Sequence, residues 1–384
     1  MQVKVHDTLA AVPAVSWASV AAEAGLYSSY EWLTLVERET PGLCRYLLAW
    51  DGTKVAGALP VYLVAGESNQ YYDPRAVFHA ALPGRNGRYC LAGSRSGYSN
   101  EPLLAGSLTG DTQREVVTAL LNELAVLSEA KGQRHSFFLY LNDRGLRRVT
   151  ACAEHAYPVL SYSGDAWLAA PGLTFDDYLA GLSTTRRKTT RKEIRRFAEQ
   201  GLSVTQADPR DRLDLIVEFA RRGNEKYGIE DSEVELRTRF GRQCATLGAH
   251  GVLFVCHRGS TVVGVALAYR WRDWLYLRMS GFDHETASSA YLYFNVVIYE
   301  PLRYCYEAGL RGLHLGTGSH HAKATRGARV GPLASVALPM PGAARADPAA
   351  PTARAGLRRY WEQQFASTPH LFDRELWRPW LGDR

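Results

Sequence analysis

The densest cluster of positive charge in the chain is the run Ser183–Arg196, which holds seven basic residues and one acid. On a helix these residues form adjacent stripes of like charge, which repel one another by about a few tenths of a kcal/mol per pair. An anionic partner removes that repulsion, and the Ser and Thr hydroxyls can donate to phosphate oxygens. The run therefore indicates either a solvated basic surface or a site for RNA, a nucleotide pyrophosphate or another polyanion. The candidate phosphate-binding residues are Arg186, Arg187, Lys188, Arg191, Lys192 and Arg195.

A second basic segment, Gly316–Arg329, directly follows a predicted strand. Gly316 and Gly318 allow the backbone to approach a ligand, and exposed amides can bind anionic oxygens. His320 is a candidate acid or base. No metal site is predicted, because the neighbouring His320 and His321 point apart and no carboxylate accompanies them. The segment indicates an anion site or, alternatively, a basic surface loop. Its basic residues, at helical spacing, are Lys323, Arg326 and Arg329.

Polar residues between these two segments are further candidates for contact with a substrate. Asp283 ends a predicted strand, where a carboxylate can act as a base, anchor an amine or cap the chain. Tyr291 and Asn295 lie one turn apart in a helix predicted from Tyr291 to Ala308, so they share a face. That face indicates a substrate contact or, alternatively, a packed aromatic stripe.

Two similar hairpins predict the frame that holds these segments. Residues 47–63 and 253–269 each contain an apolar strand, a turn with a glycine and a second strand with a Val-x-Gly sequence. They lie about half a chain apart, as an internal duplication requires. Thr174 and Asp177 predict a capped start for the helical region that carries the basic run, and Gly201 predicts its end.

A length of 384 residues favours two domains. We predict mixed helix-and-strand (α/β) domains at 1–160 and 161–338, followed by an Ala/Pro linker and a docking tail at 339–384. The net charge of +6 does not by itself indicate nucleic acid binding.

The six cysteines are scattered without metal-ligand spacing, which predicts reduced thiols. The sequence also has no GxSxG, GxxxxGK[ST] or HExxH pattern, which argues against the corresponding hydrolases, NTPases and metalloproteases. No stretch approaches the ~20 apolar residues that span a bilayer, and no signal peptide pattern is present. We therefore expect a cytoplasmic protein without a membrane partner.

The run from Phe175 to Pro332 resembles the FemAB/CelD-like, or peptidoglycan-biosynthesis-like, branch of the GNAT acyltransferase superfamily. The first half, between Tyr30 and Tyr62, is similar but looser. The resemblance implies tandem GNAT-like domains, each with a mixed, mostly antiparallel sheet flanked by helices. The segments that carry it are Leu179–Gly201, Ser280–Asp283, Phe294–Leu302 and Gly309–Ala328.

The resemblance implies transfer of an acyl group to an amine, without a metal or other cofactor. FemX-like enzymes use aminoacyl-tRNA as donor and a cell-wall precursor as acceptor, and relatives acylate small molecules or peptides in secondary metabolism. Lys323 matches the family's lysine near the donor ester, which implies that it stabilises the oxyanion or the leaving 3′-hydroxyl. Asp283 or His320 would take the proton of the amine. The acceptor pocket would include residues of the first half, namely Tyr71, Tyr72 and Arg88.

Two other functions are compatible with the sequence. One is an acyl-CoA-dependent N-acyltransferase, in which the basic helix holds the 3′-phosphate of CoA. Residues 283–290 contain two acids and no glycine where CoA-dependent GNAT enzymes have a glycine-rich turn, and this favours aminoacyl-tRNA as donor. The other is a non-catalytic GNAT pair that binds RNA or another polyanion.

Overall fold

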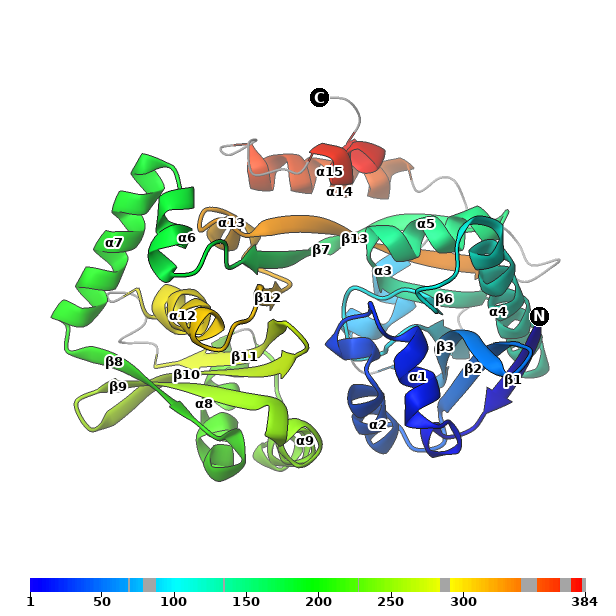
Figure 1. Cartoon of the computed structure of the whole chain (residues 1–384), viewed down its shortest axis with the longest axis horizontal. Helices are drawn as coiled ribbons and strands as arrows, with labels where there is room; N and C mark the ends of the chain where they lie inside the picture. The colour runs from blue at the N-terminus through cyan, green and yellow to red at the C-terminus, as the bar shows by residue number, and fades with distance from the viewer. Residues whose placement is uncertain are drawn as a thin grey trace. The chain divides into compact units, whose positions relative to one another are not determined.

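The computed structural model of the chain describes residues 1–67, 70–78, 88–133, 135–226, 228–283, 291–339, 351–366 and 374–381. The chain divides into two units, whose elements are labelled in Figure 1. Unit 1 consists of Met1–Asp165 and Gly331–Arg384, and unit 2 consists of Ala166–Val330. The first boundary is near the predicted one at 160/161. The second lies before the predicted 338/339, because strand β13 pairs with β6 of unit 1.

Unit 1 contains an antiparallel set of strands that ends in a parallel pair. Its strands are β1 (Gln2–His6), β2 (Cys44–Asp51), β3 (Lys54–Ala65), β4 (Arg88–Ala92), β5 (Leu103–Leu104), β6 (His135–Leu141), the start of β7 (Tyr157–Ala169) and most of β13 (Arg329–Pro339). Strands β1 to β4 pair antiparallel in sequence order, and β4 then pairs parallel with β6. The helices are α1 (Ala14–Val20), α2 (Tyr30–Glu39), α3 (Pro74–Phe78), α4 (Gly110–Ala130), α5 (Asp143–Cys152), α14 (Pro351–Phe365) and α15 (Arg374–Leu381).

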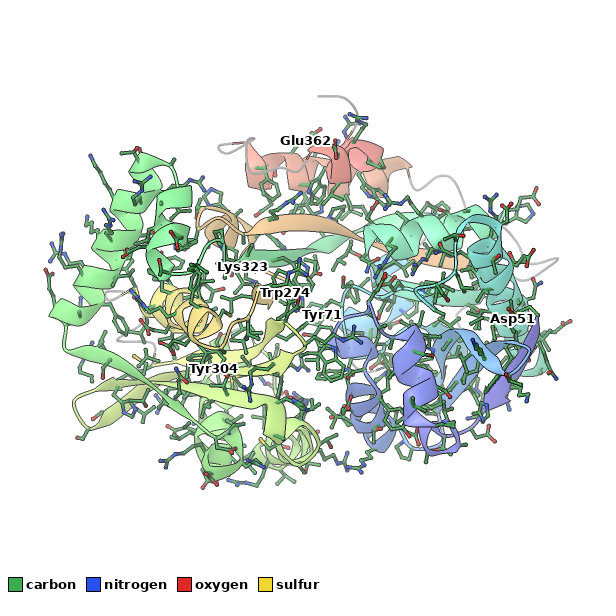
Figure 2. The ribbon with its side chains drawn as sticks, viewed as in Figure 1. Asp51, Tyr71, Trp274, Tyr304, Lys323 and Glu362 are labelled. Atoms are coloured by element: carbon green, nitrogen blue, oxygen red, sulfur yellow. The ribbon has the colours of Figure 1, made fainter. Side chains whose placement is uncertain are left out.

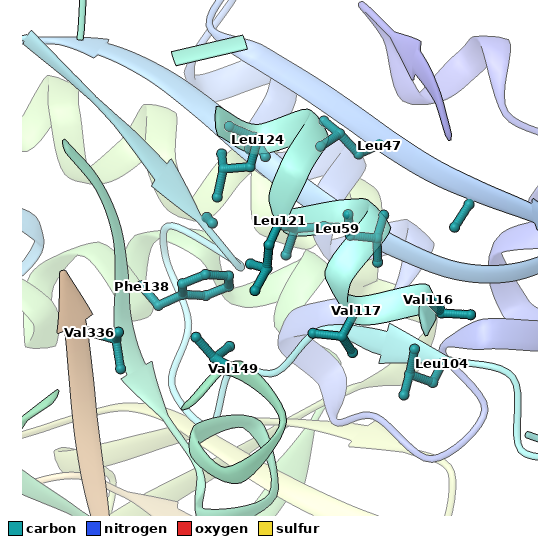
Figure 3. Close-up of a cluster of buried hydrophobic side chains, with 14 of the residues drawn as sticks. Leu47, Leu59, Leu104, Val116, Val117, Leu121, Leu124, Phe138, Val149 and Val336 are labelled. Atoms are coloured by element: carbon teal, nitrogen blue, oxygen red, sulfur yellow. The ribbon is translucent and has the colours of Figure 1, made fainter. Parts of the chain in front are cut away.

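The core of unit 1 forms where helix α4 packs on the sheet (Figure 3). Apolar residues of α4 recur at helical spacing, so one face of the helix is apolar and becomes buried. That face belongs to one buried cluster with Leu59 of β3, Phe138 of β6 and Val336 of β13. The buried apolar residues of α4 are Val116, Val117, Leu120, Leu121 and Leu124.

The C-terminal helices α14 and α15 belong to unit 1. Trp361 is fully buried, and its indole N–H donates to the carbonyl of Ser161 at 3.0 Å. Trp377 packs on Trp361 with ring centroids 4.7 Å apart. Most of the predicted Ala/Pro linker lies outside the described residues, since residues 340–350 are not among them.

Unit 2 repeats the same order of pairing. Its strands are the end of β7, β8 (Leu202–Ala207), β9 (Gly251–Arg258), β10 (Thr261–Trp271), β11 (Trp274–Phe282) and β12 (Gly312–Gly316). Strands β8 to β11 pair antiparallel in sequence order, and β11 then pairs parallel with β12. The helices are α6 (Phe175–Gly181), α7 (Thr184–Glu199), α8 (Leu213–Lys226), α9 (Glu233–Leu247), α11 (Leu292–Phe294), the π-helix η7 (Asn295–Tyr299), α12 (Glu300–Glu307) and α13 (His320–Ala324). In Figure 1, α8 and α9 lie on one side of the strands and α12 on the other.

The two units therefore share a topology, and the predicted α/β class with two similar halves is confirmed. Both predicted hairpins are present, as β2–β3 and β9–β10, with Gly52 and Gly259 in the left-handed conformation at their turns. The capping box of Thr174 and Asp177 forms both of its bonds at the start of α6. The structure adds α9, which the sequence analysis did not predict. It also shows a π-helix in the middle of the helix predicted from Tyr291 to Ala308.

Candidate active site

In unit 2, strands β11 and β12 pair over a short stretch and then separate. Trp274 to Tyr276 pair with Gly312 to His314, and the pairing stops there. Just beyond, the register between β10 and β11 shifts around Arg278, which is the position of a β-bulge. Within the described ranges, no strand pairs with the other edge of β11 from Leu277 to Phe282. An unpaired strand edge offers backbone N–H and C=O groups to a bound substrate.

The loop after β12 has an unusual backbone. Gly316, Gly318 and Ser319 all lie in the left-handed region, with φ of 65°, 76° and 47°. Glycine adopts this conformation easily, whereas Ser319 does so with strain that its surroundings must hold. Gly318 and Ser319 are exposed, so the turn presents its backbone to solvent at the end of the parallel pair. Binding of an anion by Gly316 and Gly318 stays a prediction.

Lys323, which is labelled in Figure 2, holds this loop through hydrogen bonds of its side chain. Its side chain is 3% exposed, and its Nζ donates to the carbonyls of Leu315 at 2.8 Å, Gly316 at 3.3 Å and Thr317 at 2.8 Å. An ammonium group has three N–H donors, and these three carbonyls match them. In this arrangement Lys323 shapes the loop. Its action on the donor ester stays a prediction, and it would require the ammonium to leave these carbonyls.

The two predicted proton acceptors differ in accessibility. His320 is 4% exposed, and its Nε2 accepts a hydrogen bond from the amide of Gly318 at 3.2 Å. That Nε2 is therefore unprotonated in this geometry and already occupied. The Asp283 side chain is 31% exposed, lies 3.5 Å from the Arg222 guanidinium and follows the unpaired edge of β11. Asp283 is thus the more accessible of the two bases.

Helix α7 has an outward cationic face. Because residues three and four apart share a helix face, the basic side chains on this surface lie side by side. At 1.5 Å per residue the stripe from Lys188 to Arg195 is about 10 Å long. Arg195 also lies 3.4 Å from Glu199, an exposed pair that contributes little to stability. The exposed residues of the outward face are Lys188, Arg191, Lys192, Arg195 and Arg196.

The remaining predicted donor residues of α7 contact their own unit. Arg187 donates to the carbonyls of Ala180 and Leu182, both at 3.0 Å, and so caps the end of α6. Arg186 donates to the carbonyl of Ala324 at 3.1 Å. Burial, followed by the charge of Arg326, lowers the pKa of Arg186. These two arginines therefore join α7 to its neighbours.

The inward face of α7 contains a buried ion pair that the sequence analysis missed. Glu193 is 2% exposed and binds the guanidinium of Arg326, with 2.5 Å between Oε1 and Nη2. Tyr299 donates a short hydrogen bond to the other oxygen of Glu193. Arg326, predicted to bind the donor, is thus held inside unit 2, whereas Arg329 is exposed. The sequence contains one indication of this ion pair, because Glu193 is the single acid within the basic run Ser183–Arg196.

The predicted acceptor residues of unit 2 lie at the start of the π-helix. Tyr291 has a left-handed backbone, with φ of 53°. The Asn295 Nδ2 donates to the carbonyl of Tyr291 at 3.0 Å and lies 3.5 Å from that of Glu193. Asn295 is 1% exposed, and its Oδ1 has no hydrogen-bond partner among the described residues. π-helical turns are frequent at functional sites, and an orphan acceptor beside one fits such a site.

The predicted acceptor residues of unit 1 lie near an aromatic cluster. Tyr71 is 50% exposed, Tyr72 is buried and Arg88 is exposed. Tyr140 donates a short hydrogen bond to the carbonyl of Tyr71 and packs edge-on against Tyr72 at 6.1 Å. Tyr140 itself has a φ of 55°, a strained value for a non-glycine residue. Tyr71 and Arg88 are thus exposed, whereas Tyr72 supports the cluster.

The described ranges contain no group of three His, Cys, Asp or Glu side chains able to hold a metal ion. In the same ranges, no helix combines the length and the apolar composition needed to cross a bilayer.

Comparison with known proteins gives a family and a fold. A family model named FemAB-like, and described as peptidoglycan biosynthesis/recognition, matches residues 8–340. No curated protein matches the chain. The solved structure of FemX is similar with a TM-score of 0.58 and 12% identity, over 88% of this chain and 98% of FemX.

Two further structures are similar over most of the chain. A protein of unknown function from Bacteroides thetaiotaomicron has a TM-score of 0.55 and 11% identity, over 88% of this chain and 100% of that one. The C-terminal domain of a putative lysylphosphatidylglycerol synthetase from Agrobacterium fabrum has a TM-score of 0.55 and 10% identity, over 86% of this chain and 93% of that one. At such low identity these structures show a shared fold.

Proposed function

The chain belongs to the FemAB-like family of acyltransferases, and we propose that it transfers an aminoacyl group from aminoacyl-tRNA to an amine. The acceptor would be a small molecule or a peptide, in cell-wall-like chemistry or secondary metabolism. The protein would act in the cytoplasm. The family description and the fold shared with FemX support this donor.

The observation that carries the proposal is the outward cationic face of α7. Its exposed stripe from Lys188 to Arg195 is about 10 Å long, which suits successive phosphates of a polynucleotide better than one pyrophosphate. The same helix is hydrogen-bonded to the end of α13 through Arg186. A donor bound along α7 would therefore have its ester end directed toward the loop that follows β12.

The reaction needs few groups from the protein. The neutral amine attacks the ester carbonyl carbon, a C–N bond forms, and the bond from that carbon to the ribose 3′-oxygen breaks. Asp283 accepts the proton that the amine loses and passes it to the 3′-oxygen, which leaves as a hydroxyl. A hydrogen-bond donor aimed at the oxyanion lowers the barrier by about 3 kcal/mol. The loop Gly316–Ser319, held by Lys323, would provide that donor, and Lys323 itself would do so if its ammonium left the loop carbonyls.

A transfer assay with three arms tests the proposal. The full-length protein is incubated with a tRNA pool charged with 14C-labelled amino acids, together with the small-molecule fraction of a bacterial extract. A second arm adds RNase first, and a third replaces charged tRNA with labelled acetyl-CoA. We expect labelled amide only in the first arm. Product that survives RNase, or product from acetyl-CoA, would contradict the proposal. Salt-sensitive tRNA binding without any product would instead identify a polyanion-binding protein.

A further inference from the structure

Glu193 and Arg326 form an ion pair that lies away from solvent on the inward face of α7. The two residues are far apart in sequence, and each is bound by further groups of unit 2. Glu193 accepts from Tyr299 as well as from Arg326, and Thr190 lies 3.5 Å from the Tyr299 hydroxyl. Burial raises the pKa of Tyr299, so the phenol is a donor at neutral pH. Each oxygen of Glu193 is therefore occupied.

The Arg326 guanidinium contacts several neighbouring groups of unit 2. Its Nε lies 3.0 Å from the Tyr299 hydroxyl, and its Nη1 donates to the carbonyl of Ala322 at 2.9 Å. The guanidinium stacks on the ring of Phe294, with 3.1 Å to the ring centroid. Its own carbonyl accepts from the Tyr178 hydroxyl at 2.8 Å. A planar guanidinium used in this way fixes direction as well as distance, which a lysine cannot do.

These contacts join three elements of unit 2. Glu193 belongs to α7, Tyr299 to the π-helix, and Arg326 follows α13. A buried ion pair contributes little net stability compared with apolar residues of the same volume. Its presence here is better explained by the single arrangement that it enforces among α7, the π-helix and the loop.

We infer that Glu193, Tyr299 and Arg326 are positioning residues for the transfer reaction. They hold the outward cationic face of α7 in a fixed position relative to the loop Gly316–Ser319. The phosphates and the ester of one donor molecule can then be bound at the same time, the phosphates by α7 and the ester by the loop. None of the three contacts the donor itself. The inference rests on the proposed function, because it assumes that the donor engages both α7 and the loop.

The test separates donor binding from turnover in the full-length protein. Tyr299→Phe removes one hydroxyl and keeps the volume of the side chain, and Glu193→Gln removes the charge and keeps the shape. For both, we expect kcat with saturating aminoacyl-tRNA to fall about 10–100-fold, because misplacement by about 1 Å is that costly. The Kd for uncharged tRNA, which reports the α7 contact alone, should change less than about twofold. Glu115→Gln, an exposed carboxylate of α4 in unit 1, is the matched control and should change neither value.

Several outcomes would overturn the inference. One is a kcat no lower than that of the Glu115→Gln control in both variants. Another is weaker binding of uncharged tRNA, measured as a higher Kd, with kcat unchanged. That result would show that the network contributes to tRNA binding and not to turnover. The double variant Glu193→Gln, Tyr299→Phe should lose no more kcat than the worse single variant, because both changes break one network. Fully additive losses would also count against the inference.

Hydrogen exchange distinguishes failure of this inference from failure of the proposed function. If wild-type protein transfers nothing from charged tRNA, the proposed function is wrong. Hydrogen exchange then tests the network in the protein alone, with no donor bound. Tyr299→Phe should speed amide exchange both in α7 and in residues 317–328, because the network joins them. Faster exchange in α7 alone, or in neither segment, would show that the network does not couple α7 to the loop.

Discussion

In unit 1 the chain itself continues where strand β4 stops. Strand β4 pairs with β6 from Cys90 to Ala92, and Asn100 then forms a parallel bridge to Leu141. The Asn100 side chain accepts from the amide of Ser94 at 3.0 Å and donates to the carbonyls of Ser94 at 3.1 Å and Leu139 at 2.8 Å. In unit 2 the described residues provide no such bridge after Tyr276, and β11 continues with one edge unpaired.

The comparison shows how one topology can serve two purposes. In unit 1 a buried asparagine and its loop supply the pairing that β6 needs beyond β4, so the chain satisfies its own backbone groups. In unit 2, no strand of the described ranges continues the pairing on the β12 side of β11 beyond Tyr276. The loop after β12 is tied to Lys323 on its inner side, and its exposed residues Gly318 and Ser319 are presented outward. The predicted donor residues belong to this second unit.

The largest expected effect comes from Gly312→Ala, which disrupts the antiparallel pairing of β12 with β7 in unit 2. A Cβ at this position would lie 2.1 Å from the carbonyl oxygen of Leu168, and the φ of 151° already disfavours any other residue. We expect a loss of about 3–4 kcal/mol in the free energy of unfolding. Urea denaturation followed by tryptophan fluorescence measures it. Gly309→Ala is the control, since no atom lies within 4 Å of its Cβ position. Equal losses for the two variants would contradict the predicted clash.

Lys323→Met separates the two roles of this lysine. The carbonyls of Leu315, Gly316 and Thr317 lose their donor, so we expect about 2–3 kcal/mol of destabilisation. We also expect transfer to fall at least about 100-fold, because the loop loses its shape. Urea denaturation and the charged-tRNA assay check the two effects. Lost transfer at unchanged stability would show that Lys323 acts on the donor and that its contacts with the loop are dispensable.

Asn100→Ala tests whether the bridge of unit 1 is purely structural. Its three side-chain hydrogen bonds disappear, and the buried Ser94 and Leu139 backbone groups lose their partner, so we expect about 2 kcal/mol of destabilisation. Under conditions where the variant stays folded, kcat should remain within about twofold of wild type. A large loss of kcat at small destabilisation would mean that the region of unit 1 where Asn100 bridges to Leu141 also contacts the substrate.

Neutralising the outward face of α7 should affect binding and leave stability unchanged. For Lys188→Gln, Arg191→Gln and Arg195→Gln combined, the free energy of unfolding should change by less than about 0.5 kcal/mol, as all three are exposed. The slope of log K for tRNA against log salt should become shallower by about 2, at about 0.7–0.9 per lost phosphate contact. The matched control, Lys4→Gln, Lys54→Gln and Arg114→Gln in unit 1, should leave the slope unchanged. Equal changes in both triples would point to a general charge effect.

The smallest effect concerns the thiols of the two units. Burial raises the pKa of Cys244 to about 11 and that of Cys256 to about 12, so both are thiols at pH 8 and react slowly. Cys152 of unit 1 is half-buried and should react first. Titration with a chromogenic disulfide should therefore release about one thiolate quickly, and the remaining thiols only after unfolding. Rapid labelling of Cys244 or Cys256, identified by mass spectrometry, would show that unit 2 opens locally.

Local signals explain what the sequence predicted correctly. The hairpins follow from a glycine between two apolar runs, and the start of α6 follows from Thr174 and Asp177. Helix α9 had a comparable signal that the sequence analysis did not use, a capping box between Ser232 and Glu235. These features depend on residues that are neighbours in the chain.

The parts that were missed depend on contacts between distant residues. Arg326 was predicted to face a ligand, and nothing near it in sequence indicates that Glu193 would bind it. The inward-facing and outward-facing basic residues of α7 are of the same types. The sequence alone therefore does not distinguish Arg186, which contacts the carbonyl of Ala324, from the exposed Lys188. The π-helix has no sequence signal distinct from that of an α-helix. The roles predicted for Lys323, Asp283 and His320 remain predictions.

The return of the chain into unit 1 after unit 2 sets the order in which the protein can fold during synthesis. Tyr140 of β6 donates its amide to the Ser335 hydroxyl of β13, which is 195 residues later. Unit 2 is one continuous segment and can fold as soon as Val330 leaves the ribosome. Unit 1 cannot complete its sheet until β13 has been synthesised, so the edge of β6 that pairs with β13 stays unpaired until then. Closing so long a loop is also slow. The ribosome thus releases a finished unit 2 before unit 1 is complete, and the open edge of β6 is the place where a nascent chain would first aggregate.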